Sequence, residues 1–263
     1  MSKDIALVTG ASSGIGRAFA ERLAADGFDL IVVGRREDRL IGLAASLPQA
    51  ARVVVADLAT DTGIDQVAQV CANQPITMLV NNAGLAHYMP LADLTAAEAH
   101  EVLQVKTLAP ALLTRAVLPG MLSRGTGRIV NVAGMLAFSG PAPAATPPSQ
   151  RALYVGTLAG LVALTQTLHA ELAGTGVDAH VVCPGIVATE FHTVQGMDLS
   201  ASPRMSPEDV VTATLAGIRL GETVIAPGVE DDNLLRAVFD ADLAGFAGQS
   251  ASLATRYTSA PDI

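Results

Sequence analysis

The chain has 263 residues, of which 50% are hydrophobic and 16% are charged, and its formal net charge is -9. This length suits one large α/β domain or two small ones, and the apolar content is sufficient for a large core. An acidic chain repels nucleic acid and anionic membrane, so we exclude both as partners. The low charged fraction favours an oligomer in which subunits cover part of each other's surface.

The amino-terminal segment has neither the apolar stretch nor the small-residue cleavage site of a signal peptide, which favours a cytoplasmic protein. The uncharged run 152–168 is slightly short for a membrane span and contains Tyr154 and Gln166. We therefore interpret it as a helix that is buried on both sides. Cys71 and Cys183 lie far apart without metal-ligand spacing, which predicts two reduced thiols in the core.

Short apolar runs alternate with longer helical patterns in the first half of the chain, which is typical of repeated βαβ units. The runs are nearly continuous, as expected for strands that helices cover on both faces. The predicted strands are residues 5–8, 30–33, 53–56, 78–80, 129–132, 179–183 and 223–226. The pattern predicts an α/β fold with a doubly wound, mostly parallel seven-stranded sheet and helices on both faces.

Local signals mark the ends of several helices. Gly27 predicts the end of a helix over residues 17–26. The sequence Thr95-Ala96-Ala97-Glu98 is a capping box that begins a long helix over residues 96–118. Ser206-Pro207-Glu208 combines an N-cap, a first-turn proline and an acid near the positive end of a helix.

The sequence contains no internal repeat and no interdomain linker, so we interpret residues 1–263 as a single domain. Within it, residues of about 190–210 are expected to form a substrate-cleft segment and about 229–263 a C-terminal tail. The segment 139–149 is too rich in proline and alanine for a helix or a strand and is interpreted as a loop.

The strongest local signal is Thr9-Gly10-Ala11-Ser12-Ser13-Gly14-Ile15-Gly16, which follows the first predicted strand and begins the first helix. Gly10 allows a tight turn, Gly14 lets the backbone approach a pyrophosphate, and Gly16 lets the helix pack close to the sheet. The free N–H groups at the start of the helix then face the phosphate charge. The alternative is an ordinary junction between a strand and a helix.

The spacing TGxxxGxG resembles that of the short-chain dehydrogenase/reductase family. Asn81-Asn82-Ala83-Gly84 resembles the family's motif after the fourth strand, and Asp57-Leu58 resembles its adenine-contacting pair. Pro184-Gly185, with Thr189 beyond it, resembles the element that passes beside the nicotinamide. The resemblance extends over residues of about 5–228 and implies a Rossmann-type fold, a dinucleotide cofactor and a small-molecule substrate.

The end of the second strand discriminates between the two nicotinamide cofactors. An enzyme that uses NAD would place a carboxylate here, but this sequence has Gly34 followed by Arg35 and Arg36. An arginine suits a 2′-phosphate, so we predict NADP(H), with Arg35 as the main phosphate partner and Arg36 as a helper. The alternative is that both arginines pair with Glu37 and Asp38 on a solvated turn.

The resemblance implies four catalytic side chains: an asparagine, a serine, a tyrosine and a lysine. The tyrosine is present as Tyr154, whereas the serine falls on Gly134, the lysine on Leu158 and the asparagine on Lys106. A tyrosine titrates near pH 10, about three units too high for a base at neutral pH, which is about 4 kcal/mol. Leu158 adds no charge and desolvates Tyr154. Tyr154 is therefore expected to stay protonated and to favour reduction over oxidation.

Two interpretations of Lys106 are open. In the first, its ammonium points toward Tyr154 or the ribose and replaces the lost lysine. In the second, Lys106 pairs with Glu101 or another acid, or reaches solvent.

Other polar residues are weaker candidates. Ser139, Thr146 and Ser149 lie in or beside the expected loop, which we interpret as solvated. His87 and His192 fall beside the expected cleft, where either could act as an acid or a base, but we favour packing or hydrogen-bonding roles for both. No His, Cys, Asp or Glu cluster in the sequence has metal-ligand spacing.

Three functions are consistent with these features: an NADP(H)-dependent carbonyl reductase with a rearranged site, a catalytically inactive NADP(H)-binding partner or sensor, and a non-redox isomerase or cyclase. We favour the first, with an apolar carbonyl substrate. The candidate pocket residues are Leu85, Met89, Met135, Leu136, Phe138 and Phe191. Helices over residues 96–118 and 151–173 are apolar on more than one face, which favours a homodimer, a homotetramer or a mixed oligomer with an active relative.

Overall fold

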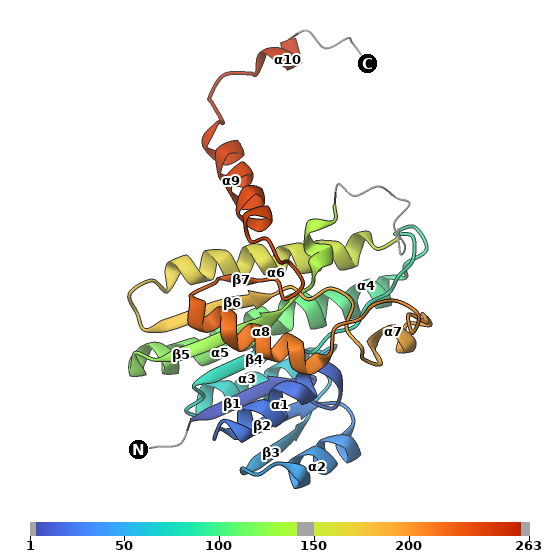
Figure 1. Cartoon of the computed structure of the whole chain (residues 1–263), viewed down its shortest axis with the longest axis vertical. Helices are drawn as coiled ribbons and strands as arrows, with labels where there is room; N and C mark the ends of the chain where they lie inside the picture. The colour runs from blue at the N-terminus through green and yellow to red at the C-terminus, as the bar shows by residue number, and fades with distance from the viewer. Residues whose placement is uncertain (1–3, 141–149, 259–263) are drawn as a thin grey trace. The chain divides into compact units, whose positions relative to one another are not determined.

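The computed structural model describes residues 4–140 and 150–258 (Figure 1). The chain divides into two compact units, Met1–Gly228 and Val229–Ile263. The interpretation of the whole chain as one domain stays a prediction. Of the second unit we note two helices, α9 (Asn233–Ala247) and α10 (Thr255–Thr258), neither of which has a buried residue.

The first unit is built on a parallel sheet with the strand order β3-β2-β1-β4-β5-β6-β7. Its strands are β1 (Ile5–Thr9), β2 (Asp29–Gly34), β3 (Ala51–Val55), β4 (Met78–Asn81), β5 (Gly127–Val132), β6 (Val177–Val182) and β7 (Val224–Ile225). All seven predicted strands are confirmed, with ends that differ by two residues at most. Because the chain moves outward from β1 to β3 and returns to β4 beside β1, a crevice opens at the carboxyl ends of these central strands.

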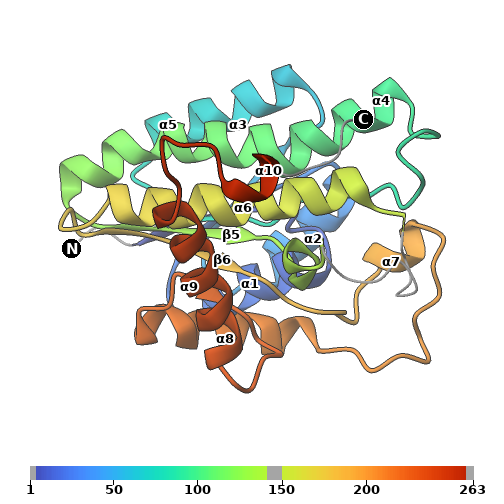
Figure 2. The same ribbon diagram turned by 90° about the horizontal axis from the view of Figure 1, so that it is seen from above.

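Helices cover both faces of this sheet, as its alternating side chains require (Figure 2). Ala6 and Val8 of β1 pack with α1, α2 and α8, whereas Leu7 between them packs with α3 and α5. The helices and helical turns of this unit are α1 (Gly14–Ala25), α2 (Glu37–Ser46), α3 (Asp61–Asn73), α4 (Ala96–Leu103), the π-helical turn η1 (Gln104–Leu108), α5 (Ala109–Arg124), the 3-10 turn η2 (Met135–Phe138), α6 (Ala152–Glu171), α7 (Phe191–Val194) and α8 (Pro207–Leu220). The expected Rossmann-type architecture is therefore confirmed.

The predicted helix signals have the expected geometry, with one correction. Thr95 and Glu98 form the capping box, and the Ser206 hydroxyl accepts a hydrogen bond from the Asp209 N–H. Gly27 follows α1 with a φ of +98°, as a C-terminal cap requires. The helix predicted over residues 96–118 was wrong as one continuous α-helix, because a π-helical turn separates α4 from α5, which extends to Arg124.

Helix α6 contains the uncharged run and has the length and apolar composition of a membrane span, alone in this respect among the described helices. A core helix of a soluble protein passes the same test. Here α6 packs against β6 and η2. The two cysteines are free and buried, as predicted.

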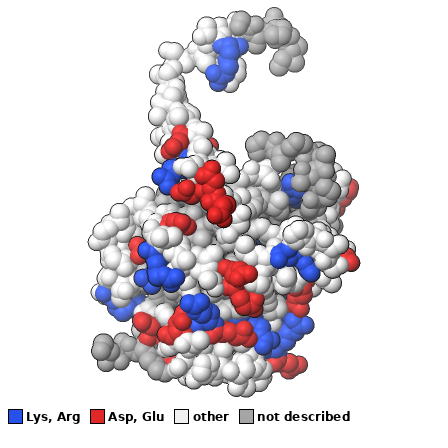
Figure 3. All heavy atoms as spheres, viewed as in Figure 1, with Lys and Arg blue, Asp and Glu red and all other residues white. Residues whose placement is uncertain are grey.

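Charged side chains of both signs are scattered over the surface seen in Figure 3, where the described basic and acidic residues are interspersed among uncharged ones. Of the 139–149 loop, residues 141–149 lie outside the described residues.

Candidate cofactor and active site

The glycine-rich turn between β1 and α1 lies very close to two other segments of the chain. Gly10 and Gly14 have φ angles of +67° and +53°, which L side chains rarely adopt. A Cβ atom at Gly10 would lie 2.8 Å from Nδ2 of Asn82, and one at Gly14 would lie 2.9 Å from Cγ2 of Thr189. A Cβ atom at Gly16 would overlap the Gly10 carbonyl. These contacts explain why glycine stands at all three positions.

Thr9 and Asn82 hold this turn against the segment that follows β4. The Thr9 hydroxyl accepts hydrogen bonds from the N–H groups of Asn82 and Ala83 at 2.9 and 3.0 Å and donates one to the Val80 carbonyl at 3.3 Å. The Asn82 amide in turn donates to the Thr9 carbonyl at 2.9 Å and the Gly10 carbonyl at 3.4 Å. The side-chain amide of Asn82 therefore stabilises the turn itself.

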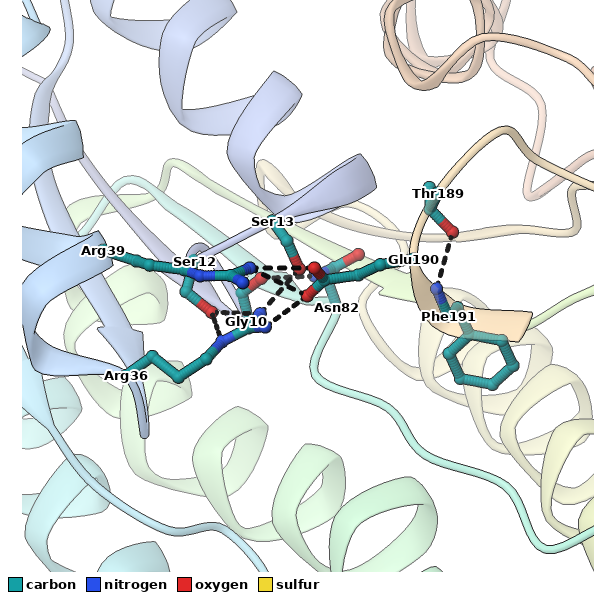
Figure 4. Close-up of polar contacts among 9 residues, drawn as sticks. All are labelled: Gly10, Ser12, Ser13, Arg36, Arg39, Asn82, Thr189, Glu190 and Phe191. Carbon is teal, nitrogen blue, oxygen red and sulfur yellow. Dashed lines mark hydrogen bonds and ion pairs between the residues drawn. The ribbon is translucent and has the colours of Figure 1, made fainter. Parts of the chain in front are cut away.

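A cluster of polar side chains lies on the other side of the turn (Figure 4). Arg36, the residue before α2, donates to the Ser12 hydroxyl from Nε at 3.0 Å and from Nη2 at 2.8 Å, and to the Ser13 hydroxyl at 2.8 Å. It also forms an ion pair with Glu190. Arg39, in the first turn of α2, donates to the same carboxylate at 2.8 and 3.1 Å. We call these five residues the turn cluster.

Four residues of the turn cluster, all except Arg36, border a cleft of about 650 Å³ between the starts of α1 and α8. Its walls include Ser12, Ser13, Gly14, Arg17, Glu21, Arg39, Thr189, Glu190 and Arg204. Hydroxyl and guanidinium donors at the start of a helix are suited to an anion. This is the side of the sheet where the sequence predicts the phosphate groups of a dinucleotide.

Arg35 points to a different set of partners. Its guanidinium lies 3.9 Å from the carboxylates of both Asp57 and Glu101, and its side chain is 60% exposed. Glu101 also contacts Nε2 of His87 at 3.0 Å, so the hydrogen-bonding role favoured for His87 is confirmed. Of the two arginines after β2, it is Arg36 that contacts the glycine-rich turn. Among the described contacts, neither arginine pairs with Glu37 or Asp38, which was the alternative interpretation.

The remaining predicted cofactor residues line the same edge of the sheet. Leu58 is buried, and the Asp57 carboxylate accepts a hydrogen bond from the Ala59 N–H. Ile15 packs against the core beneath the turn. The Pro184 carbonyl accepts a hydrogen bond from the Met135 N–H at 2.9 Å. A Cβ atom on Gly185 would meet open space among the described residues.

Tyr154 lies in an apolar cluster beyond the carboxyl ends of β5 and β6. Its ring packs edge-on against Tyr88, with centroids 5.5 Å apart, and at 6.3 Å from Phe191. The candidate pocket residues Leu85, Met135, Leu136, Phe138 and Phe191 pack against this cluster as expected. Apolar side chains therefore pack around Tyr154, which is itself only 8% exposed.

Burial keeps the Tyr154 hydroxyl protonated. Burial raises its pKa far above the ordinary value, and the neighbouring Tyr88, to which it donates a hydrogen bond, raises it further. Burial also raises the pKa of Tyr88 to about 12, although the Arg151 charge and the hydrogen bond from Tyr154 act in the opposite direction. Both hydroxyls therefore stay protonated near neutral pH and are poor bases.

Lys106 lies in the π-helical turn, and its side chain is only 4% exposed. Its ammonium donates a hydrogen bond to the Val132 carbonyl at 3.0 Å. Burial lowers the pKa of Lys106 to about 8, with a smaller opposing effect from Cys183. Pairing with Glu101 or exposure to solvent is therefore wrong, and no described hydrogen bond joins Lys106 to Tyr154.

Gly134 and Leu158 lie next to each other in this site. A Cβ atom on Gly134 would lie 3.6 Å from Cδ1 of Leu158 and 3.6 Å from the Pro184 carbonyl, which is ordinary van der Waals contact. Leu158 is 1% exposed and belongs to the same apolar cluster as Tyr154. The site thus has room for a small side chain at Gly134 but carries an uncharged wall at Leu158.

Of the weaker polar candidates, Ser139 donates a hydrogen bond to the Leu136 carbonyl at 2.8 Å and accepts one from Arg151. Thr146 and Ser149 lie outside the described residues. Burial, and then the charge of Arg204, lowers the pKa of His192, which favours its neutral form. The described residues contain no group of three or more His, Cys, Asp or Glu that is suited to a metal ion.

Comparison with known proteins identifies the family. Residues 4–198 match the family described as short chain dehydrogenase. The chain belongs to this family. Sulfoacetaldehyde reductase 2 of Chromohalobacter salexigens is 38% identical to this short-chain dehydrogenase over 207 residues, which are 76% of this chain and 79% of that protein.

Two solved structures share both the sheet and its helices. A short-chain dehydrogenase from Sphingobium yanoikuyae in complex with NADPH is 31% identical, with a TM-score of 0.90 over 97% of this chain and 100% of that one. The bulky-bulky ketone specific alcohol dehydrogenase from Comamonas testosteroni is 27% identical, with a TM-score of 0.86 over 98% and 99% of the two chains. The family resemblance inferred from the motifs is therefore confirmed.

The residues of this short-chain dehydrogenase fit a dinucleotide. Side chains at Gly10, Gly14 and Gly16 would obstruct the turn, and the N–H groups that begin α1 lie beside the Ser12 and Ser13 hydroxyls. The two guanidinium groups of the turn cluster add positive charge at the end of β2. This donor set is suited to a phosphate.

Sequence reasoning missed four residues of this site: Thr9, Arg39, Tyr88 and Glu190. Arg39 was detectable as a third arginine close to Arg35 and Arg36, in the first turn of the helix that follows them. Thr9 was part of the glycine motif but received no role. Tyr88 and Glu190 had no signal, because each acquires its role only by contact with a residue far along the chain.

Proposed function

We propose that this protein is an NADP(H)-dependent oxidoreductase that reduces an apolar carbonyl compound, with Tyr154 as the proton donor. One observation carries the proposal: Arg36 and Arg39 converge with the Ser12 and Ser13 hydroxyls at the start of α1. A 2′-phosphate requires such positively charged donors, whereas a ribose 2′-hydroxyl would require a carboxylate at the end of β2. The solved relative that contains NADPH supports the same cofactor.

Different residues of the site would hold different parts of the cofactor. Arg36, with Arg39, would hold the 2′-phosphate, and Arg35 would contribute from beside Asp57 near the adenine. The turn from Gly10 to Gly16 would hold the pyrophosphate, and Thr189 and the Pro184-Gly185 pair would border the nicotinamide. Asn82 would act indirectly, because its amide holds the turn.

The environment of Tyr154 supports reduction as the direction of the reaction. Burial keeps its hydroxyl protonated, so it can donate a hydrogen bond to a carbonyl oxygen but is a poor base toward an alcohol. A reduced nicotinamide bound beside Pro184, Gly185 and Thr189 would be the source of the hydride. The Tyr154 proton then completes the alcohol, and the hydroxyl must first leave its hydrogen bond with Tyr88.

Apolar side chains around Tyr154 support an apolar ketone or aldehyde as the substrate. The described wall of the site includes Leu158 and Phe191, which exclude water and offer no charge to a polar substrate group. The ketone-specific alcohol dehydrogenase among the solved relatives supports the same substrate class. The identity of the ketone remains open to a screen of bulky and small carbonyl compounds.

Calorimetric titration with NADPH and NADH tests the cofactor, using the wild type, Arg36→Ala and Arg35→Ala. We expect micromolar NADPH binding, a loss of about tenfold or more in Arg36→Ala, and a smaller loss in Arg35→Ala. A ketone screen with NADPH then tests the reaction, with Tyr154→Phe as the control. Absence of binding of both cofactors to the wild type would refute the proposal.

The contacts of Lys106 and Leu158 favour a second candidate, an inactive family member that binds NADP(H) as a partner or sensor. Lys106 donates to a backbone carbonyl, and Leu158 presents no charge to Tyr154. NADPH binding without turnover of any ketone, equal in the wild type and Tyr154→Phe, would favour this candidate. No specific observation favours an isomerase or cyclase.

A further inference from the structure

The carboxylate of Glu190 lies where the donors of the turn cluster meet (Figure 4). It forms the ion pair with Arg36, accepts two hydrogen bonds from Arg39 at 2.8 and 3.1 Å, and bonds to the Ser13 side chain. Arg36 and Arg39 lie in the segment after β2, and Glu190 lies just before α7, 154 residues from Arg36. Three segments that are distant in the sequence therefore meet at one carboxylate.

This carboxylate is an anion throughout the physiological range. Burial alone would raise the pKa of Glu190, but hydrogen bonds from Arg39, Arg36 and Ser13 outweigh it and lower the pKa to about 2. A phosphate group would find the same donors, since it also accepts from guanidinium and hydroxyl groups. Two anions would repel each other in this position, so one must leave when the other binds.

The turn cluster is also open enough for such an exchange. The side chain of Glu190 is 35% exposed, and those of Arg36 and Arg39 are 41% and 50% exposed. Ion pairs at this exposure contribute little to stability, because water and salt screen them. A phosphate dianion carries more charge and more acceptor oxygens than a carboxylate, so it has the advantage in the same cluster.

We propose that Glu190 is a determinant of cofactor specificity: its carboxylate holds Arg36 and Arg39 in place of the 2′-phosphate of NADP(H), and this phosphate displaces it on binding. This inference rests on the proposed function, because it concerns the same cofactor. Glu190 competes with NADPH and does not compete with NADH, which lacks the 2′-phosphate. Its position before Phe191 places the displaced residue next to the substrate pocket.

Fluorescence and calorimetric titrations of the wild type and Glu190→Gln with NADPH and NADH test the inference. The matched control is Asp26→Asn, which removes a similarly exposed carboxylate that pairs with Arg22, neither residue lining the cleft. We expect Glu190→Gln to bind NADPH about five- to tenfold more tightly than the wild type, with NADH affinity changed less than twofold. The control should change neither affinity by more than about twofold.

The outcomes separate this inference from the proposed function. If the wild type binds NADPH and Glu190→Gln binds it equally or more weakly, Glu190 only holds the arginines in place and the inference is overturned. Equal tightening for NADPH and NADH would indicate a general charge effect and would also overturn it. If neither the wild type nor any variant binds either dinucleotide, both the proposed function and this inference are refuted.

Discussion

The difference in stability between the wild type and Lys106→Met should depend on pH, because the buried ammonium of the wild type titrates and methionine does not. Methionine has a similar unbranched side chain and carries no charge. Burial lowers the pKa of Lys106 from 10.5 to about 8, which corresponds to about 3 kcal/mol at about 1.4 kcal/mol per pH unit. The substitution also removes the hydrogen bond to the Val132 carbonyl, which contributes about 1 kcal/mol.

The sign follows from proton binding. Between pH 8 and 10.5 the unfolded state binds the Lys106 proton and the folded state releases it, so the stability of the wild type rises with pH across this window. Below pH 8 the whole burial penalty is present. We therefore expect Lys106→Met to be about 2 kcal/mol more stable than the wild type at pH 7, and about 1 kcal/mol less stable above pH 10.5.

Urea unfolding followed by far-ultraviolet circular dichroism measures this difference between pH 6 and 10, since the chain has no tryptophan for fluorescence. NMR of protein labelled at lysine gives the pKa directly, because Lys3 and Lys106 are the two lysines of the sequence and Lys3 serves as the internal reference. A stability difference that stays constant from pH 7 to 10 would refute the reasoning, as would a Lys106 pKa near 10.5.

Three further predictions follow from other positions. Gly134→Ser should leave the free energy of unfolding within about 0.5 kcal/mol of the wild type, because a Cβ atom there has ordinary contacts. Gly16→Ser should lower the free energy of unfolding by several kcal/mol, because its Cβ atom would overlap the Gly10 carbonyl. Urea unfolding of both variants measures the difference. Tyr154→Phe should lower kcat for ketone reduction about 100-fold or more with NADPH affinity changed less than twofold, and unchanged kcat would exclude Tyr154 as the proton donor. If the exposed side of α6 is a subunit interface, Leu164→Lys should lower the mass measured by light scattering, whereas Leu220→Lys at the end of α8 should not.

The fold was predictable because each element has a local signal. Continuous apolar runs identified strands that are covered on both faces, and Thr95 and Ser206 identified the starts of helices by their capping hydrogen bonds. The π-helical turn at Lys106 was not predictable, because it keeps the apolar pattern of an α-helix while inserting one residue into its turn. In the structure Lys106 lies in this turn and is buried. The sequence had also allowed a Lys106 side chain that contacts Glu101 or solvent.

The candidate site was predictable to the extent that its contacts are local. The glycine pattern from Gly10 to Gly16 predicts its own turn, because steric limits on φ act within a few residues. The partner of Arg36 was not predictable, since a single sequence contains no information that pairs it with Glu190 across 154 residues. For the same reason the sequence ranked Arg35 above Arg36, although only the structure shows which guanidinium contacts the turn.

The consecutive residues Thr189, Glu190 and Phe191 connect the glycine-rich turn to the apolar cluster around Tyr154. The Thr189 methyl group fills the space that Gly14 leaves free, and Glu190 holds Arg36 and Arg39. Phe191 follows directly, with its N–H donating to the Thr189 hydroxyl at 3.3 Å and its ring 6.3 Å from that of Tyr154. A displacement of Glu190 that moves its backbone would also shift the Phe191 ring, whereas a rotation of the Glu190 side chain alone would leave the ring in place. Cofactor binding and the surroundings of Tyr154 are coupled in the first case and independent in the second.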